Sequence, residues 1–229
     1  MSRGVQPKDN SAAHDATSET AQTAVWKSDF GRDYSDRNTF DTAALDQLYR
    51  SNYGISRRQM NETFLAEIAK DANILEVGCN TGNQLLLLRE MGYSNLAGIE
   101  LQPYALELAR QRLPGVSLRL GSALDLPHGD SSFDLVFTSG VLIHIAPPDL
   151  PRALDELYRC SRSYIWGMEY YAPEPTEVPY RSHSGLLWKM DYARKYLERF
   201  PDLELVREQR VPYLQDAKVD SVFLLRKKP

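Results

Sequence analysis

The segment from Ile74 to Gly82, ILEVGCNTG, brings an acidic side chain and a loop of small residues to the end of an apolar run. An apolar run that stops at glycines is typical of a buried strand that opens onto a ligand. If a helix follows, its first backbone N–H groups and its positive dipole end face that ligand. The chemistry indicated is the binding of a small molecule by main-chain groups.

The spacing of the glycines separates two kinds of ligand. A dinucleotide loop reads G-x-G-x-x-G and is shaped for a pyrophosphate, whereas this loop reads Gly78-Cys79-Asn80-Thr81-Gly82. Asn80 stands where the middle glycine would be, and asparagine tolerates positive φ, so the turn still forms. Because it leaves less room for a pyrophosphate, the loop disfavours an NAD enzyme and favours a nucleoside-sulfonium ligand.

Two acids strengthen this interpretation. Glu76 lies inside the first strand, where an acid is costly unless it binds something, so we expect it to orient loop amides or to meet a ligand ammonium. Glu100 closes the next strand, at the distance of about 20 residues where an acid binds a ribose diol. The alternative for Glu100 is a solvated acid at a strand end.

Strands and helices alternate from residue 73 onward, which predicts one α/β domain with a mostly parallel sheet covered on both faces. The expected strands are 74–77, 96–100, 116–120, 133–138 and 164–167, followed by an antiparallel edge formed by 203–206 and 221–225. The expected helices are 84–91, 104–112 and 150–160. This is a seven-stranded, Rossmann-like fold with no internal repeat.

The chain divides by composition into three parts. Residues 1–24 are polar and small, which predicts a disordered tail. Residues 25–70 carry aromatic side chains and two helical patterns, the second opened by the S-x-x-Q capping box of Ser56 and Gln59, and we expect them to form a helical lid. Residues 71–229 form the ligand-binding domain, with a proline-rich substrate insertion at about 169–192.

Four segments resemble, in order and spacing, the motifs of class I S-adenosylmethionine-dependent methyltransferases: ILEVGCNTG, GIELQPYALELAR, LGSALDLP and FDLVFTSGVLIHI. The resemblance implies that S-adenosylmethionine is the cofactor, with Gly78, Asn80 and Gly82 around its amino-acid part and Glu100 at its ribose. It also implies that Leu101 lines the adenine, with Ser122 and Ala123 at its edge. Ser122 replaces the acid that is usual there.

A second resemblance runs from about residue 26 to the C-terminus. WKSDFGRDYSDRN, VLIHIAPPDL, ELYRCSRSYIWGMEYYAPEPTEVPYRSH and FPDLELV are similar to the pseudaminic-acid-biosynthesis-associated methylases. The departures lie late in the chain: the Y-R-G-H of that subfamily reads YRSH at 180–183, its K-R-D-F reads KMDY at 189–192, and its acidic-Trp ending is replaced. The substrate side has therefore changed more than the cofactor side, and the sugar substrate of that subfamily is not carried over.

His144 follows the fourth strand, where this class presents groups to the transferred methyl. With a reference pKa near neutrality it is a candidate general base for a hydroxyl or amine acceptor. The alternative is a histidine that packs a helix start. Ser139 and Gly140 are expected to shape the pocket floor.

Tyr170 and Tyr171 follow Glu169 at the end of the fifth strand, on the ligand-binding edge of a parallel sheet. Aromatic faces attract a sulfonium cation and exclude water from it. The other interpretation is a pair of half-buried tyrosines that pack the insertion.

Tyr34 and Arg37 lie in the expected lid. Arg37 could grip the methionyl carboxylate bidentately, or form an ordinary surface salt bridge. The insertion carries a cationic cluster of Arg181, His183 and Lys189. The cluster could bind an acidic substrate, or its members could be ordinary solvated surface charges. We expect Arg57 and Arg58 to lie at the surface.

The composition limits the kinds of molecule that the protein is expected to bind. Lys+Arg 27 against Asp+Glu 31 gives a net charge of −4, which argues against a nucleic-acid partner. Cys79 and Cys160 lack the spacing of a zinc site or a disulfide scaffold, and no segment has the character of a secretory signal or a membrane span. We expect a cytoplasmic monomer or homodimer that acts on a small molecule, without metal.

Three functions follow. The leading one is methyl transfer to a small-molecule acceptor such as an acidic sugar or an amino-acid-like metabolite. The second is an S-adenosylmethionine cyclase that forms azetidine-2-carboxylate and methylthioadenosine, which needs aromatic residues around the sulfonium and no acceptor pocket. The third, a non-catalytic binding subunit, is disfavoured by the intact loop and acids.

Overall fold

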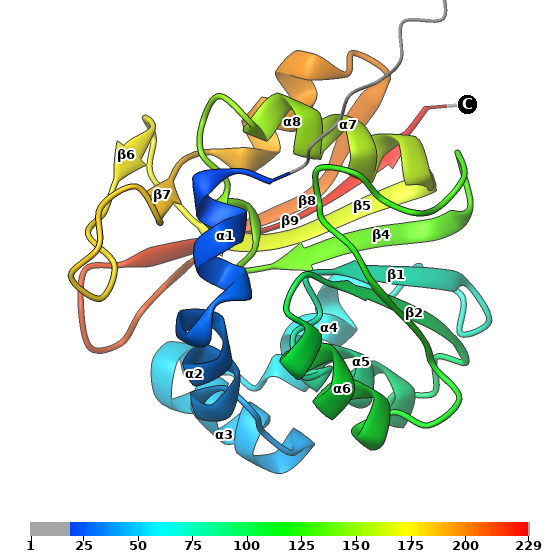
Figure 1. The fold of residues 1–229 in the computed structure, drawn as a ribbon. Coiled ribbons are helices and arrows are strands. Elements are labelled where there is room, and N and C mark those ends of the chain that lie inside the picture. The colour runs from blue at the N-terminus through cyan, green and yellow to red at the C-terminus, as the bar shows by residue number, and fades with distance from the viewer. Residues whose placement is uncertain (1–18, 229) are drawn as a thin grey trace, which may run out of the picture.

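The computed structural model describes residues 19–228, which form a seven-stranded sheet with helices on both faces (Figure 1). In sheet order the strands are β3 (Ser117–Leu120), β2 (Asn95–Glu100), β1 (Asn73–Val77), β4 (Phe133–Ser139), β5 (Ser161–Tyr170), β9 (Val219–Lys227) and β8 (Leu203–Pro212). The run from β3 to β5 is parallel, and β9 and β8 join it antiparallel. The expected fold class is confirmed.

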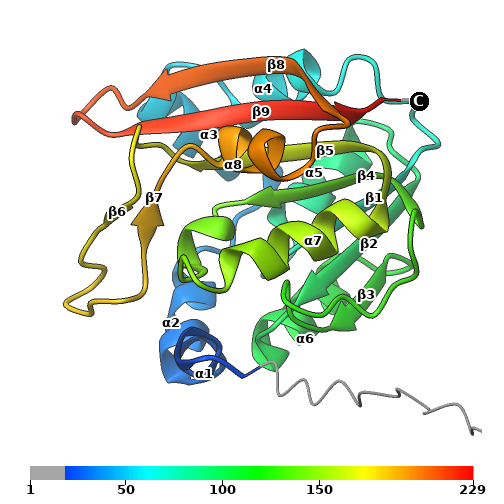
Figure 2. The ribbon, with the colours of Figure 1, turned by 90° about the horizontal axis from the view of Figure 1, so that it is seen from above.

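Helices cover both faces because the central strands are apolar on both. β1 is buried at four of its five positions, as continuous apolar runs in parallel sheets require. One buried cluster joins the sheet to α7 (Leu150–Cys160) and α8 (Tyr192–Arg199). The other joins it to α4 (Arg57–Phe64), α5 (Asn83–Glu90) and α6 (Pro103–Arg112), on the far side of the sheet in Figure 2.

All seven expected strands are present, and the three expected helices correspond to α5, α6 and α7. After residue 160, three elements were not expected: α8 and the short hairpin of β6 (Thr176–Glu177) and β7 (Trp188–Lys189). β5 is also longer than expected, because it pairs with β9 as far as Tyr170. The irregular part of the insertion therefore begins at Tyr171.

The N-terminal helices are α1 (Ala21–Lys27), α2 (Asp29–Arg37) and α3 (Thr42–Tyr53). Helix α1 begins inside the segment expected to be disordered, because Thr20 and Thr23 form a capping box at its start. The prediction of disorder is therefore wrong for residues 21–24, and residues 1–18 of the expected tail lie outside the described residues.

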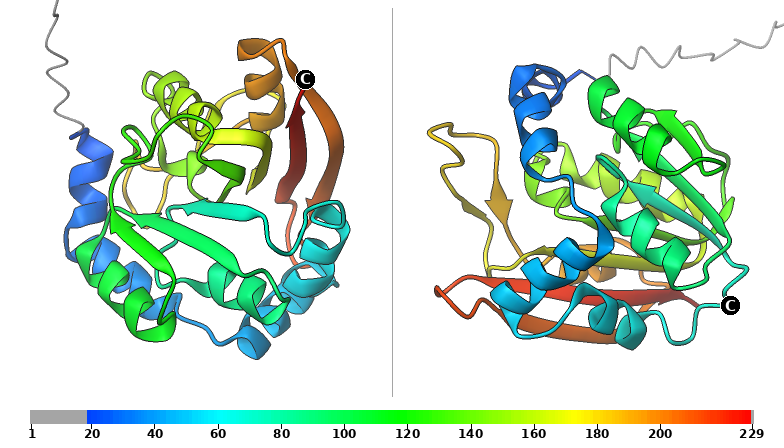
Figure 3. Two further views of the ribbon diagram at one scale, coloured as in Figure 1. Left: turned by 90° about the vertical axis from the view of Figure 1, so that its right-hand side faces the viewer. Right: turned by 90° about the horizontal axis from the view of Figure 1, so that it is seen from below.

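Helices α1 and α2 stand at the carboxyl ends of the parallel strands, where β4 points in Figure 1. Both views of Figure 3 place them on the side of the molecule away from the C-terminal residues. Among residues 19–228, no helix combines the length and the apolar character needed to cross a membrane.

Candidate active site

A cavity of about 270 Å³ lies between the carboxyl ends of the parallel strands and the N-terminal helices. Its lining residues come from the ends of β1, β2 and β4, from the loop after β3, and from α1, α2 and α3. This is the edge of a parallel sheet where ligands bind, because the strand ends and helix starts leave main-chain groups free there.

The glycine loop has the backbone that its sequence predicts. Gly78, Asn80 and Gly82 all have positive φ, at 75°, 47° and 79°. A Cβ on Gly78 would come within 2.5 Å of the Val141 side chain, so glycine is required there. Gly78 and Asn80 line the cavity, whereas Gly82 lies behind them as the N-cap of α5.

Glu100 lines the cavity at the end of β2 and is only 8% exposed. Its carboxylate accepts hydrogen bonds from the backbone N–H of Asn80 and of Gln102, both at 2.7 Å. Burial raises the pKa of Glu100, and the two amide bonds oppose that rise. The three residues expected near an adenine also line the cavity: Leu101, Ser122 and Ala123.

Glu76 also lines the cavity and is 4% exposed. Its Oε2 has no hydrogen-bond partner among residues 19–228, and the same holds for Oε1 of the neighbouring Gln84. Burial raises the pKa of Glu76 well above its usual range, and the charge of Arg57 opposes this rise. Two buried, unpaired acceptors beside the glycine loop fit a ligand that donates hydrogen bonds, such as an ammonium group.

The aromatic lining comes from the N-terminal helices. Tyr34, Tyr49 and Trp26 line the cavity, and the buried Nε1 of Trp26 has no partner in the described part of the chain. Tyr170 and Tyr171 are not among the lining residues that the structure describes. The two tyrosines continue the β5–β9 pairing: Tyr170 pairs with Asp220, and Tyr171 N–H donates to the Val219 carbonyl at 2.9 Å.

Each of the two excluded tyrosines has another contact. The Tyr171 ring lies 3.6 Å from the Arg210 guanidinium carbon, and the Lys189 ammonium lies 5.8 Å from the Tyr170 ring. The structure therefore does not bring the tyrosine pair into the cavity as we expected. Sequence reasoning missed Tyr49, which lies on the same helix face as the buried Leu45.

His144 lines the cavity, and its Nδ1 lies 2.8 Å from the Leu186 carbonyl oxygen. A carbonyl only accepts, so the proton sits on Nδ1 and Nε2 carries the free lone pair. Burial lowers the pKa of His144 to about 4, and the Leu186 bond opposes this only in part. The imidazole is therefore neutral at physiological pH, with its centre 4.4 Å from that of the Trp26 ring.

The loop that carries His144 is held by hydrogen bonds to Glu169 of β5. Ser139 and Gly140 line the cavity as expected, and Gly140 has a φ of 68°. The buried Glu169 carboxylate accepts hydrogen bonds from Val141 N–H and Ile143 N–H, at 3.2 and 3.3 Å. Burial raises the pKa of Glu169 to about 7. Sequence reasoning used Glu169 only as a landmark and missed this role.

For Arg37 the structure fits the surface alternative, whereas the expectation that Arg57 lies at the surface is wrong. Arg37 is exposed and is not among the described residues that line the cavity. Arg57 is fully buried, and its guanidinium donates to Tyr49 Oη at 2.9 Å and to Asn61 Oδ1 at 3.0 Å. The missed signal is helical spacing, because Arg57 precedes the buried Phe64 by two turns on the face toward the sheet.

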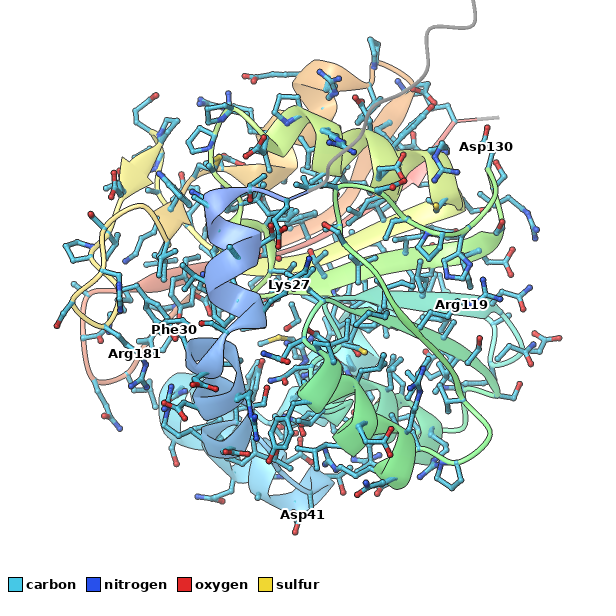
Figure 4. All side chains as sticks on the ribbon, in the orientation of Figure 1. Lys27, Phe30, Asp41, Arg119, Asp130 and Arg181 are labelled. Atoms are coloured by element: carbon cyan, nitrogen blue, oxygen red, sulfur yellow. The ribbon has the colours of Figure 1, made fainter. Side chains whose placement is uncertain are left out.

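The tip of the insertion rests on α2. The Phe30 ring packs edge-on against the rings of Tyr180 and His183, with centroids 6.1 and 5.5 Å apart, and Figure 4 labels Phe30 beside Arg181. Arg181 and His183 are exposed, and Lys189 is half-buried. His183 therefore contacts α2, whereas Lys189 lies beside the Tyr170 ring, and none of the three residues of the expected cationic cluster is among the described residues that line the cavity.

The chain is similar to proteins of known activity. A family model described as a methyltransferase domain matches residues 74–163. A demethylmenaquinone methyltransferase from Lactiplantibacillus plantarum is 30% identical over 189 residues, which cover 77% of this chain and 77% of that protein. A malonyl-[acyl-carrier protein] O-methyltransferase from Serratia marcescens is 37% identical over 89 residues, which cover 39% of this chain and only 34% of that protein. Several of the curated relatives are thus matched over about a third of their length.

The fold is similar to that of a solved 1,6-didemethyltoxoflavin-N1-methyltransferase from Burkholderia thailandensis, which holds 1,6-didemethyltoxoflavin and S-adenosylhomocysteine. That match has a TM-score of 0.68 and 20% identity, and it covers 90% of this chain and 88% of that one. The PH0226 protein from Pyrococcus horikoshii is similar at a TM-score of 0.64 and 18% identity, over 86% of this chain and 99% of that one. At these identities the likeness concerns the fold alone.

Proposed function

The chain belongs to the class I S-adenosylmethionine-dependent methyltransferases, and from this premise we propose that it transfers a methyl group to a small-molecule acceptor. The observation that carries the proposal is one cavity whose lining combines three kinds of group. Glu76 Oε2 and Gln84 Oε1 are acceptors without a partner among residues 19–228, Glu100 supplies a second carboxylate, and His144 supplies an imidazole. This combination suits a ligand with an ammonium group, a ribose and a reactive centre.

The residues divide the work of holding the cofactor. Glu76 and Gln84 would accept hydrogen bonds from its ammonium group, and Glu100 would accept them from its ribose hydroxyls. Leu101 and Ala123 supply apolar surface for adenine. Ser122 offers a hydroxyl where an acid is usual in this class.

The residues near the reacting end have three tasks. S-adenosylmethionine supplies an activated methyl group together with its leaving group. The rings of Tyr34, Tyr49 and Trp26 exclude water and present faces to a cation. His144 Nε2 would take the proton of the acceptor. Because the pKa of His144 is about 4, it suits an acceptor whose own proton is acidic.

The acceptor we propose is an acidic sugar or an amino-acid-like metabolite. Its support is a pair of exposed basic side chains at the tip of the insertion, Arg181 and His183, of which His183 packs on Phe30 of α2.

The test is an assay of products rather than of binding. Purified protein is incubated with S-adenosylmethionine and a panel of acidic sugars, amino acids and carrier-bound acids, and products are separated by mass spectrometry. We expect S-adenosylhomocysteine and an acceptor heavier by one methyl. No S-adenosylhomocysteine with any acceptor of the panel would count against methyl transfer.

One observation favours a second function on the same cofactor. The cavity of about 270 Å³ lies near the lower limit of ligand pockets, which is about 300 Å³, so under the closed lid it suits a single ligand. In a cyclase, Glu76 would accept the ammonium proton and free the α-amine to bond to the γ-carbon. The carbon–sulfur bond breaks in the same step and methylthioadenosine leaves. Incubation without acceptor separates the two functions, because only the cyclase forms azetidine-2-carboxylate together with methylthioadenosine.

A further inference from the structure

The two amides that hold Glu100 belong to two different elements. Asn80 lies in the glycine loop, and Gln102 is the N-cap of α6. Their backbone N–H groups fix one carboxylate oxygen each, both at 2.7 Å. The orientation of Glu100 therefore depends on where these two residues sit.

The side chains of the same two residues hold the lid. Asn80 Oδ1 accepts a hydrogen bond from Ser35 Oγ of α2 at 2.8 Å. Gln102 Nε2 donates to the carbonyl oxygens of Trp26 and Ser28, at 3.1 and 3.0 Å, where α1 meets α2. Ser35 and Gln102 are 1% and 5% exposed, so these bonds are shielded from water.

Gly31 lies where Gln102 contacts the junction of α1 and α2, which we call the joint. A Cβ at position 31 would overlap the Trp26 carbonyl and lie 3.2 Å from Gln102 Nε2. Glycine at position 31 is therefore required for α1 and α2 to meet as closely as they do beside Gln102. Gly31 lines the cavity, so the closed joint also forms part of the ligand site.

The far end of the lid is fastened separately. Asn83 Nδ2 donates to the Asn38 carbonyl at 2.6 Å, and the Arg112 guanidinium bonds both Asn83 Oδ1 and the Phe40 carbonyl. These bonds do not involve Glu100. They hold residues 38–40 through contacts separate from those of Asn80 and Gln102.

We propose that Asn80 and Gln102 are positioning residues that couple occupancy of the ribose site at Glu100 to closure of the lid. Each residue contacts Glu100 through its backbone and the lid through its side chain. A ligand that immobilises the carboxylate fixes both backbones and so lowers the cost of ordering the lid, and by reciprocity a closed lid tightens ligand binding. The inference rests on the proposed function, because it takes an adenosine-containing cofactor as the ligand.

Two variants remove the lid contacts and keep the contacts to Glu100. Gln102→Ser retains an oxygen for the N-cap of α6, where Gln102 now accepts from Tyr104 N–H at 3.2 Å, but it cannot reach the lid. Asn80→Gly keeps the backbone N–H and tolerates positive φ, but it lacks the acceptor for Ser35. Gln111→Ser is the matched control, on the exposed face of the same helix α6.

The measurements are amide hydrogen exchange of residues 21–37, with and without S-adenosylhomocysteine, and the dissociation constant of that compound by calorimetry. We expect the ligand to protect these amides in the wild type and in Gln111→Ser. In Gln102→Ser and Asn80→Gly most of that protection should be lost, and affinity should weaken about tenfold.

Unchanged lid protection in both variants overturns the coupling, and so does a wild-type lid whose exchange ignores the ligand. Wild-type protein that binds no S-adenosylhomocysteine overturns the proposed function instead. The two failures are therefore distinguishable.

Discussion

The strand side of the cavity is held by main-chain bonds between neighbours in the sheet, whereas its lid side is held by side chains that reach across it. On the strand side, Gly78 and Cys79 donate their amides to the Ile99 carbonyl at 2.8 and 3.0 Å. On the lid side, Trp26 packs on the ring of His144, more than a hundred residues later, and Phe30 packs on Tyr180.

The two sides of the cavity are therefore suited to different functions. A wall built by sheet pairing is preorganised and can fix the cofactor without a conformational change. A wall held by a few side-chain bonds can open at modest cost, as a lid must for ligand exchange. Substitutions on the strand side should therefore act directly on affinity, whereas those at the lid side should act through lid closure, on affinity or on turnover.

The largest expected effect is that of Glu100→Ala. It removes the ribose acceptor and leaves two buried amides unpaired, so affinity for S-adenosylhomocysteine should fall by about 3 kcal/mol, roughly 150-fold. Calorimetry measures this, with Glu107→Ala on the exposed face of α6 as the control. Unchanged affinity in Glu100→Ala would contradict the assignment of Glu100, and of the strand side, to cofactor binding.

His144→Phe should act on turnover instead. Loss of a general base costs about 100-fold or more in rate, while affinity for S-adenosylhomocysteine should stay within about threefold. The control is His128→Phe, because His128 is a histidine outside the cavity. Equal rates for His144→Phe and wild type with an acceptor that carries an acidic hydroxyl would show that His144 only packs against Trp26.

A comparison of two tyrosines tests which aromatic residues face the cation. Tyr34→Leu removes a ring that lines the cavity and should cost about 1–2 kcal/mol, roughly tenfold in affinity for S-adenosylmethionine. Tyr171→Leu removes a ring that lies against Arg210, and the affinity should change less than twofold. If calorimetry instead shows a larger loss of affinity in Tyr171→Leu than in Tyr34→Leu, the aromatic residue that faces the cation lies at the end of β5.

The strand side was predictable because its signals are local. Gly78, Asn80 and Glu100 stand at strand ends, and in a parallel sheet the strand ends meet at one edge, so their sequence positions alone predict their proximity. Seven strands and the lining positions after β2 and β3 followed from the same rule.

The lid side was not predictable in the same way. Tyr170 and Tyr171 lie outside the cavity because their main chains bond to the start of β9, a strand almost fifty residues later. Arg57 is buried because Tyr49 and Asn61 accept its hydrogen bonds. The sequence does not show which side chains will accept hydrogen bonds from a buried guanidinium. Helical spacing does show that Arg57 lies on the face of α4 that is turned toward the sheet.

The smallest expected effect concerns pH and stability, and it also bears on the lid side. The pKa of His144 in the fold is about 4, below its ordinary value of 6.5, so between these values the unfolded chain binds more protons than the native one. The contribution of His144 to stability is therefore complete above about pH 6.5 and is lost as the pH falls toward 4.

His144→Phe should remove this dependence, so that at pH 5.5 the wild type loses about 1 kcal/mol more unfolding free energy, relative to pH 8, than the variant does. The comparison between the two proteins is needed because the carboxyls of Glu169 and Asp220, with pKa values raised to about 7 and about 6, change stability in the opposite direction. Their contribution is common to both proteins and cancels. Denaturant unfolding at the two pH values measures the difference, and parallel pH profiles would mean that water reaches the imidazole and that the lid does not seal it.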